Sequence, residues 1–398
     1  MAHNKNTGDA DGASHKISTR LNHIGREPRE NFGFVNPPLY RGSTILYPTV
    51  SALKGKNQPY TYGRRGTPTI KALEDAITEL ENGAHTALTP SGLSACAMGL
   101  LSMVSAGGHV LVTDSVYQPV RKICNGILAR MGVETTYYDP HIGSGISELI
   151  QPETQLIYTE SPGSQTFEMQ DLPAIAEAAH ERDIPVMADN TWGTPLFYNP
   201  LELGADIVVH AGTKYFGGHS DVNLGTITTT EQYAAQVRQT HGDMGQCPGP
   251  EDANLCLRGL RTLAMRLDQH QKSALDIANW FSERPEVSRV LHPALENDPG
   301  HAIWKRDFKG ASGLFSVILK EQSLDAVASM LDGLELFGMG ASWGGFESLA
   351  LPFDPTSYRS AVPWEKQGQC VRFFIGLEDI DDLKADLDAG FDRLRAAA

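Results

Sequence analysis

The 398-residue sequence lacks several features that mark specialised classes of protein. Its five cysteines are odd in number and form no CxxC pair, which argues against a disulfide framework or a zinc finger and favours free thiols in the cytoplasm. No apolar run approaches the length of a transmembrane helix. Positive charge is also scarce, because 33 Lys and Arg face 48 Asp and Glu, for a net charge of −15. Phosphate backbones and anionic lipid would repel such a chain, so neither nucleic acid nor membrane is expected as a partner.

What is present is ample apolar material, 41% of the residues, which is enough for a large core and two or three domains. Residues 1–20 are polar and lack the apolar segment of a signal peptide, so a disordered tail is expected there. Residues 21–66 are interrupted by prolines, and we expect an irregular arm that is held by a neighbouring subunit. A large domain over residues 67–260 and a smaller one over residues 261–398 complete the expected organisation.

Short apolar runs alternate with amphipathic stretches in the middle of the chain. Buried strands are expected at residues 109–113, 155–159, 185–188 and 205–210, with helical patterns between several of them. This alternation predicts an α/β fold with a mostly parallel sheet covered by helices. After residues 225–229, a long helical region at 254–284 leads to strands at 313–319 and 371–375 and a closing helix at 379–395.

Four polar features lie at or near the ends of predicted elements, where open α/β sheets bind ligands. Ser91 and Gly92 form a small-residue turn before a helix, which could present backbone N–H groups to an anion but alone reads as a cap. Asp189 follows one strand, and Lys214 follows another in an uncharged stretch where burial would lower its pKa. Arg372 lies within a predicted strand and therefore needs an anionic partner, for which a structural carboxylate is the first expectation.

Taken together, these features suit one cofactor. Pyridoxal phosphate needs a lysine for a Schiff base, an acid beside its pyridine nitrogen and a phosphate cup. The cup, the acid and the lysine occur here in that order, each at a separate strand end.

Seven motifs in order then resemble the cysteine and methionine metabolism family of pyridoxal-phosphate enzymes. The resemblance runs from about residue 17 to 395, and the motif versions around Tyr62 and Ser342 are similar to those of bacterial cystathionine β-lyases. It implies the aspartate-aminotransferase-like fold (fold type I), with a mostly parallel sheet in the large domain and a smaller α/β C-terminal domain. The motifs are Val35-Asn-Pro-Pro-Leu, Tyr62-Gly-Arg-Arg-Gly-Thr-Pro-Thr, Ser91-Gly-Leu-Ser-Ala, Asp189-Asn-Thr-Trp, Gly212-Thr-Lys-Tyr, Gly218-His-Ser-Asp and Ser342-Trp-Gly-Gly-Phe-Glu-Ser.

The resemblance implies roles on the cofactor side of the site. Lys214 would hold pyridoxal phosphate covalently and, once freed, remove the substrate α-proton. Asp189 would keep the pyridine nitrogen protonated, and Tyr117, which read alone is a core aromatic, would stack on the ring. The implied phosphate contacts are Gly92, Leu93 and Thr213 of one subunit with Tyr62 and Arg64 of its neighbour, so a homo-oligomer is expected whose active unit is a dimer, and which is a tetramer overall.

The resemblance also implies the substrate side and the reaction. Ser342 and Arg372 would bind the α-carboxylate of an amino acid, Arg372 as a two-pronged donor, and Trp343 would line the pocket. The implied reaction is β-elimination of L-cystathionine to homocysteine, pyruvate and ammonia in methionine biosynthesis, with cystine or other S-substituted cysteines as further substrates. Thr61 and Ala341 replace aromatic residues of the β-lyase pattern, which leaves the substrate preference open.

Other functions are weighed against this one. A γ-lyase or γ-synthase is the main alternative, but such relatives carry a Glu where this chain has Ala341. Residues 340–344 form a literal GxSxG, yet a serine hydrolase using Ser342 needs a later histidine, and none follows His301. A metal site at His219 and Asp221 lacks a third ligand, so no metal is expected. A non-catalytic binding protein is the last alternative.

Overall fold

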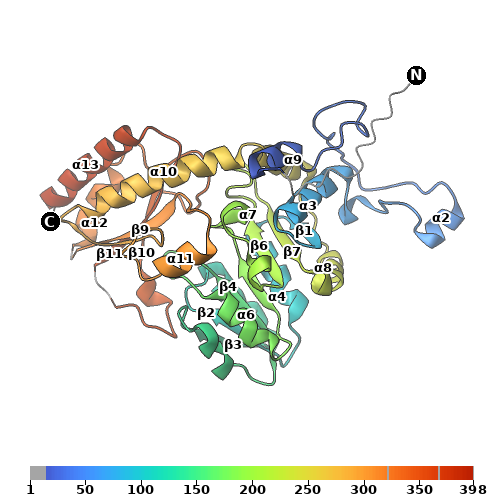
Figure 1. Ribbon diagram of the computed structural model, residues 1–398, viewed down its shortest axis with the longest axis horizontal. Helices are drawn as coiled ribbons and strands as arrows, with labels where there is room; N and C mark the ends of the chain where they lie inside the picture. Colours follow the sequence, from blue (N-terminus) through green and yellow to red (C-terminus); the bar gives the residue numbers. More distant parts are fainter. Residues whose placement is uncertain (1–14, 321, 366–367, 398) are drawn as a thin grey trace.

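The computed structural model describes residues 15–320, 322–365 and 368–397, which form two sheets and an extended N-terminal arm (Figure 1). The expected tail falls largely outside the described residues. The tail is expected to extend to residue 20, but helix α1 (Ile17–His23) already begins at Ile17. Leu21 is buried in the core, and Arg20 pairs with Glu79, so tertiary contacts order this polar segment.

The large sheet has seven strands in the order β1-β7-β6-β5-β4-β2-β3. The pairs from β3 through β6 are parallel, while β7 runs antiparallel to both β6 and β1. The expected α/β fold with a mostly parallel sheet is therefore confirmed. The strands are β1 (His85–Thr89), β2 (His109–Thr113), β3 (Glu134–Tyr138), β4 (Thr154–Glu160), β5 (Val186–Asp189), β6 (Ile207–Ala211) and β7 (Gly225–Thr229).

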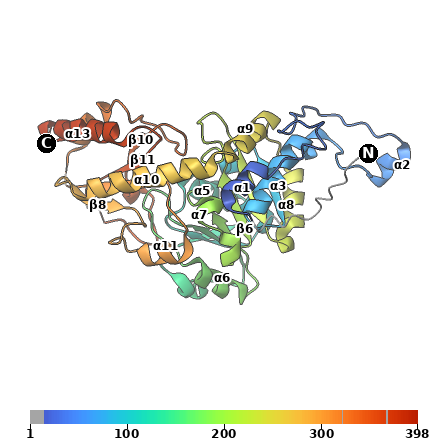
Figure 2. The ribbon, with the colours of Figure 1, turned by 45° about the horizontal axis from the view of Figure 1, so that its top comes forward.

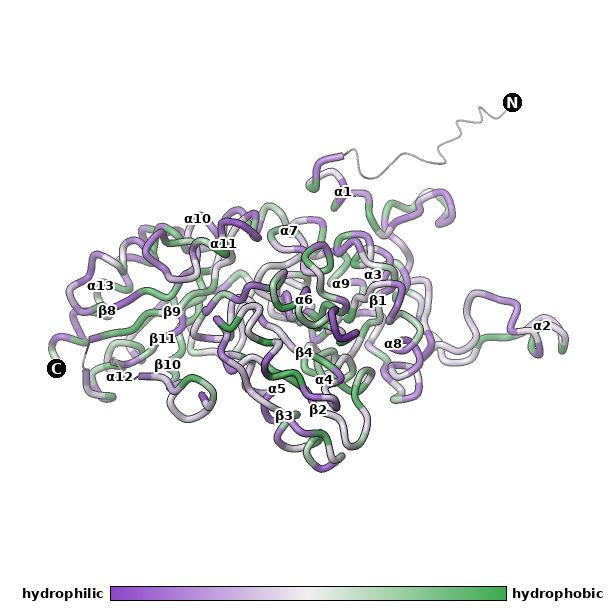
Figure 3. Tube along the Cα trace, turned by 60° about the horizontal axis from the view of Figure 1, so that its bottom comes forward, coloured by the Kyte–Doolittle hydropathy of each residue, from purple (hydrophilic) through white to green (hydrophobic). Residues whose placement is uncertain are grey.

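Helices cover both faces of this sheet, as the continuous apolar character of its strands requires. Val110 and Val112 of β2 pack into a core with α4 and α5, while Leu111 packs into the core on the opposite face with α3 and α6. Figure 3 shows hydrophobic residues along the central strands and hydrophilic stretches on surface helices. The helices are α3 (Pro68–Leu80), α4 (Gly92–Met103), α5 (Gln118–Ile123), α6 (Leu172–His180), α7 (Thr194–Phe197), α8 (Glu231–Asp243) and α9 (Pro250–Leu260).

The small sheet is wholly antiparallel and is ordered β10-β11-β9-β8. Helices α12 and α13 cover it around a second core that includes Phe315, Phe373 and Phe391. Its elements are β8 (Val287–Leu291), α11 (His301–Asp307), β9 (Leu314–Leu319), α12 (Leu324–Asp332), β10 (Leu349–Phe353), β11 (Gln369–Phe374) and α13 (Ile380–Ala397).

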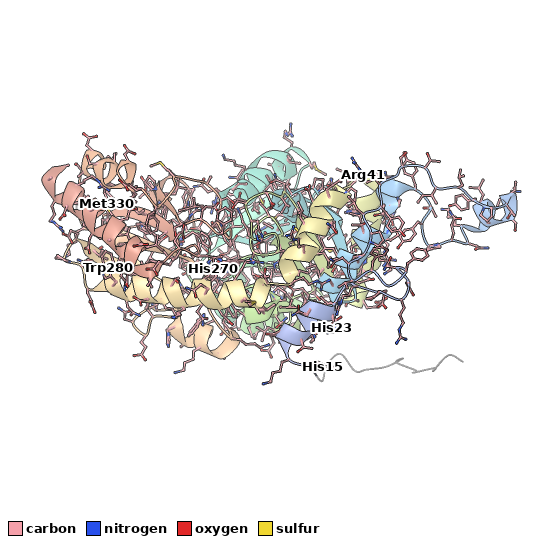
Figure 4. All side chains as sticks on the ribbon, turned by 90° about the horizontal axis from the view of Figure 1, so that it is seen from above. His15, His23, Arg41, His270, Trp280 and Met330 are labelled. Atoms are coloured by element: carbon pink, nitrogen blue, oxygen red, sulfur yellow. The ribbon has the colours of Figure 1, made fainter. Side chains whose placement is uncertain are left out.

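The long helix α10 (Leu263–Ser282) connects the two sheets (Figures 2 and 4). Its His270 bonds to the Ile375 carbonyl oxygen after β11 and packs against Tyr215 after β6, while Trp280 packs against the core that includes Met330 of α12 (Figure 4). The single helical region expected at 254–284 is instead two helices, α9 and α10. The chain turns between them where Arg261 donates to the carbonyl oxygens of Leu21 and Ile24. This long-range contact cannot be predicted from the local sequence.

The N-terminal arm extends away from the body and carries the short helix α2 (Val50–Gly55) (Figure 1). Thr49 caps this helix, because its hydroxyl accepts from the backbone N–H of Ala52. The arm exposes a set of large apolar side chains that a body of this size normally buries: Phe32, Phe34, Val35, Leu46, Val50 and Leu53.

Candidate active site

A cavity lies at the carboxyl ends of β4, β5 and β6, where the small sheet region closes over the large one. Its large-sheet wall contains Gly92, Tyr117, Asp189 and Lys214. Its opposite wall, the small-sheet wall, is made by Arg372 of β11 and by Ala341 and Trp343 of the segment before β10, where Ser342 accepts a hydrogen bond from Lys214. The structure therefore brings together residues that the sequence places almost 300 positions apart.

Lys214 lies in a turn after β6, and its side-chain amine donates to the Ser342 hydroxyl over 2.6 Å. Burial, with help from the Arg372 guanidinium, lowers the pKa of Lys214 to about 8, while Asp189 opposes this shift. The amine also lies 5.4 Å from the centre of the Trp343 ring. A lysine with a pKa near neutrality serves as a nucleophile and as a proton acceptor.

Asp189 ends β5 with its carboxylate open to the cavity. Its Oδ1 accepts from the Thr191 backbone N–H at 2.9 Å and the Thr191 hydroxyl at 2.6 Å. Among the described residues, its Oδ2 has only the weak thiol donor of Cys96, at 3.8 Å. Burial raises the pKa of Asp189, and the Thr191 bonds oppose that shift. Oδ2 is therefore the oxygen that remains available to a cationic N–H group in the cavity.

The N-terminus of α4 forms one end of the cavity. Ser91 caps the helix, since its hydroxyl accepts from the backbone N–H of Ser94. A Cβ on Gly92 would lie 2.4 Å from the Cβ of Ala211, so only glycine permits this close approach of α4 to β6. Leu93 and Thr213 also line the cavity, although the Thr213 hydroxyl already exchanges hydrogen bonds with the Leu224 backbone. Backbone N–H groups at such a helix start favour an anion.

Tyr117 lies at the entrance to α5 with its side chain 44% exposed, rather than in the core. Its backbone N–H donates to Glu160 Oε2 over 2.7 Å. Burial raises the pKa of the Tyr117 hydroxyl, and Cys96, Glu160 and Asp189 add to the shift. The ring is thus free to stack on a planar group in the cavity.

The segment before β10 reaches Lys214 because it contains glycine at a critical position. Gly344 has φ +86°, and a Cβ there would lie 3.0 Å from the Lys214 backbone. This approach places Ser342 on the lysine amine and puts Trp343 edge-on to Tyr215, with ring centroids 5.6 Å apart.

Arg372 is 7% exposed, and its guanidinium donates to the carbonyl oxygens of Gly340 and Ser342 at 3.3 and 3.1 Å. No carboxylate in the described part of the chain pairs with it, so the structural carboxylate that we first expected is absent. Burial lowers the pKa of Arg372 to about 10. A buried, charged fork without an acid partner is suited to an anionic ligand.

Two further candidate residues, Tyr62 and Arg64, do not line this cavity. Tyr62 is 48% exposed, and Arg64 donates to the carbonyl oxygen of Gly242 in α8. The expectation that they reach a neighbouring subunit stays a prediction.

Sequence reasoning did not select several of the lining residues, among them Cys96, Glu160 and Thr191. Glu160 ends β4 directly beside Asp189, and burial together with that aspartate raises the pKa of Glu160 well above its usual range. The signal that singled out Asp189, a carboxylate at the end of an apolar run, applies equally to Glu160.

The alternative sites fit the structure poorly. Ser342 lies in an irregular segment rather than on the strand-to-helix turn of a hydrolase, and it accepts from a lysine. The His219 ring bonds to the carbonyl oxygen of Gly217 in its own loop. No helix among the described residues is long and apolar enough to cross a membrane.

Comparisons with known proteins match nearly the whole chain. The sequence model of the family described as "Cys/Met metabolism PLP-dependent enzyme" matches residues 18–392. A protein of Rhizobium johnstonii is 50% identical over 94% of this chain and 96% of its own length. Cystathionine β-lyase MetC of Escherichia coli is 42% identical, covering 96% of this chain and all of that enzyme.

The fold matches as well. The crystal structure of metB from Corynebacterium glutamicum superposes with a TM-score of 0.89 at 32% identity, covering 96% of this chain and 100% of that one.

Proposed function

Because this chain belongs to the Cys/Met metabolism family of pyridoxal-phosphate-dependent enzymes, we propose that it is a carbon–sulfur lyase that cleaves L-cystathionine by β-elimination. The products are homocysteine, pyruvate and ammonia. The observation that carries the proposal is one cavity in which the Lys214 amine contacts Ser342 beside an acid-free Arg372 and the carboxylate of Asp189.

The cavity fits the family's cofactor. Only glycine at position 92 leaves room where the N-terminus of α4 approaches β6, and this helix start suits a phosphate. Asp189 Oδ2, bonded to the weak thiol donor of Cys96, can accept from a pyridinium N–H, and the Tyr117 ring is exposed to stack on the cofactor ring. Lys214 would hold the cofactor covalently. When bound, pyridoxal phosphate supplies an electron sink for negative charge at the substrate α-carbon.

The protein's own residues divide the remaining work. Arg372 binds the α-carboxylate, with the Ser342 hydroxyl beside it. The Lys214 amine, with its lowered pKa, takes the α-proton. The C–S bond electrons then leave with sulfur as the thiolate of homocysteine. The enamine that remains hydrolyses to pyruvate and ammonia.

Elimination at the β-carbon is favoured over γ-chemistry by two residues. A γ-elimination requires a second proton to leave the β-carbon, and Ala341 can neither accept it nor hold a substrate ammonium. The bulk of Trp343 narrows the pocket beside Lys214. Neither Lys214 nor Asp189 separates the two reactions, because both reactions begin with loss of the α-proton.

Product analysis with L-cystathionine tests the proposal. Pyruvate and homocysteine in equal amounts are the expected products. If 2-oxobutyrate and cysteine dominate, the chain is a γ-lyase, and if neither ketoacid forms, the proposed substrate is wrong.

The proposal includes a homo-oligomer, a tetramer whose smallest active unit is a dimer, located in the cytoplasm. The exposed apolar side chains of the arm support an oligomer, because a second subunit would bury them. Tyr62 and Arg64, which lie outside their own cavity, are then positioned to complete the neighbouring one. The five free cysteines are in keeping with a reducing compartment.

A further inference from the structure

Gln165 lines the same cavity as Lys214 and Arg372, yet none of the roles described above involves it. It lies in the loop between β4 and α6, with its side chain partly exposed. This loop faces the segment that follows β10, so Gln165 lies where the two sheet regions meet over the site.

The backbone of Gln165 is held in an uncommon conformation. Its φ is +65°, and the Thr166 N–H donates to the Ser164 carbonyl oxygen at 2.8 Å, which closes a tight turn around it. A glutamine in the left-handed region is strained, and strain of this kind persists where the surroundings enforce it. Here the Ser164 N–H is fixed on the Ser115 carbonyl oxygen at 2.8 Å, and Phe167 also has a positive φ.

The side-chain amide of Gln165 is oriented by Tyr358. The Tyr358 hydroxyl donates to Gln165 Oε1 over 2.9 Å. With its oxygen engaged, the amide has two N–H donors left, and neither has a protein acceptor in the described part of the chain. An amide held in this way presents hydrogen-bond donors rather than an acceptor to a ligand.

Tyr358 is itself anchored through the next residue. The buried Arg359 guanidinium donates to Asp114 Oδ2 at 3.0 Å, to the Thr166 hydroxyl at 3.4 Å and to Glu168 Oε1 at 2.5 Å. It therefore ties the segment after β10 to the loop immediately beside Gln165. An amide fixed before binding loses little conformational entropy when a ligand arrives.

We propose that Gln165 is a specificity-determining residue whose amide N–H groups bind the distal carboxylate of the substrate. The inference rests on the proposed function, since cystathionine carries a second amino-acid group beyond sulfur. Arg372 accounts for the α-carboxylate, and the aromatic residues expected near the pocket mouth are replaced by Thr61 and Ala341. The Gln165 amide, held by Tyr358, supplies a polar group on the cavity wall, whereas Ala341 has no polar side chain and Thr61 is not among the lining residues.

The test compares two thioethers in the loaded enzyme: L-cystathionine, and S-ethyl-L-cysteine, which lacks the distal carboxylate. Gln165→Glu keeps the shape but replaces the donors with a like charge. We expect kcat/KM for cystathionine to fall about tenfold or more, the size of a lost hydrogen bond to a charged group, with S-ethyl-L-cysteine changed less than about twofold. Tyr358→Phe should give the same selective loss, but smaller. The matched control is Ser357→Ala, whose hydroxyl bonds to the Asp354 carbonyl oxygen instead.

Cofactor absorbance and Tm are measured for each variant, so that a disturbed fold is recognised separately from lost recognition. Equal losses with both substrates, or no loss with either, would overturn the assignment of Gln165. The wild-type enzyme reports separately on the proposed function, because pyruvate from S-ethyl-L-cysteine without pyruvate from cystathionine would contradict that substrate whatever the variants do.

Discussion

The two walls of the cavity differ in how their polar groups are satisfied. On the large-sheet wall, Asp189 accepts two bonds from Thr191, and the Thr213 hydroxyl is bonded to the Leu224 backbone. On the small-sheet wall, the partners of Arg372 within the described ranges are carbonyl oxygens and include no acid. The bonded polar groups of the large-sheet wall suit a cofactor that stays bound from one turnover to the next. The small-sheet wall keeps an unmatched charge, which suits an anion that enters and leaves at every turnover.

The largest effect is expected from removing Lys214, on the large-sheet wall. Lys214→Ala should lower turnover by at least about a thousandfold, because it removes both the covalent anchor and the proton acceptor. It should also abolish the visible absorbance of the lysine-linked cofactor. Lys71→Ala, which breaks an exposed pair with Asp75, is the control. Borohydride reduction followed by peptide mapping would refute the assignment if it placed the pyridoxyl group on another lysine.

Removing Arg372, on the small-sheet wall, should affect the substrate rather than the cofactor. Arg372→Ala should lower kcat/KM for cystathionine about a hundredfold, since the α-carboxylate loses its charged partner, while cofactor absorbance stays unchanged. Arg393→Ala is a matched control, because that guanidinium also donates to backbone carbonyl oxygens but lies away from the cavity. Loss of cofactor from the Arg372 variant would mean that the two walls are not separable.

A third experiment asks whether the large-sheet wall is completed by a second subunit. Arg64→Ala and Lys214→Ala should each be inactive, yet mixing them and allowing subunit exchange should restore measurable pyruvate release. Some mixed dimers would then contain one intact site. If exchange is demonstrated by mass and no activity returns, Arg64 acts within its own subunit.

The smallest effect concerns stability of the cofactor-free protein. The pKa of Lys214 is about 8 when folded and 10.5 ordinarily, so between these values the unfolded chain binds a proton that the folded chain does not. The lysine therefore destabilises the fold at pH 7, and this penalty is lost as pH rises from about 8 towards 10.5. Lys214→Met should have the higher Tm at pH 7, and the gap should narrow by pH 10. A gap independent of pH would contradict the lowered pKa.

Local patterns identified much of this molecule. The run at residues 109–113 predicts β2 with its observed bounds, because its three central residues are all apolar, as a strand buried on both faces favours. Asp189 and Lys214 were predicted as site residues because each is a charged residue that directly or closely follows an apolar strand.

Other features could not be read from local patterns. Strands β1 and β3 were missed, since Thr-rich and partly exposed segments such as Glu134–Tyr138 become strands only by pairing at the sheet edges. The break between α9 and α10 contains no proline and follows from the Arg261 contact with the chain near α1.

The sequence by itself determined the alternating strands, the main core and the order of the polar residues along the chain, because these depend on nearest neighbours and on hydrophobic period. Only the tertiary structure decided that Arg372 bonds to backbone carbonyl oxygens, that the approach at Gly344 brings the Ser342 hydroxyl to the Lys214 amine, and that Tyr358 orients Gln165. Each of these depends on atoms from segments far apart in the chain. Their mutual distance is set by how the two sheets pack, and no local pattern encodes that distance.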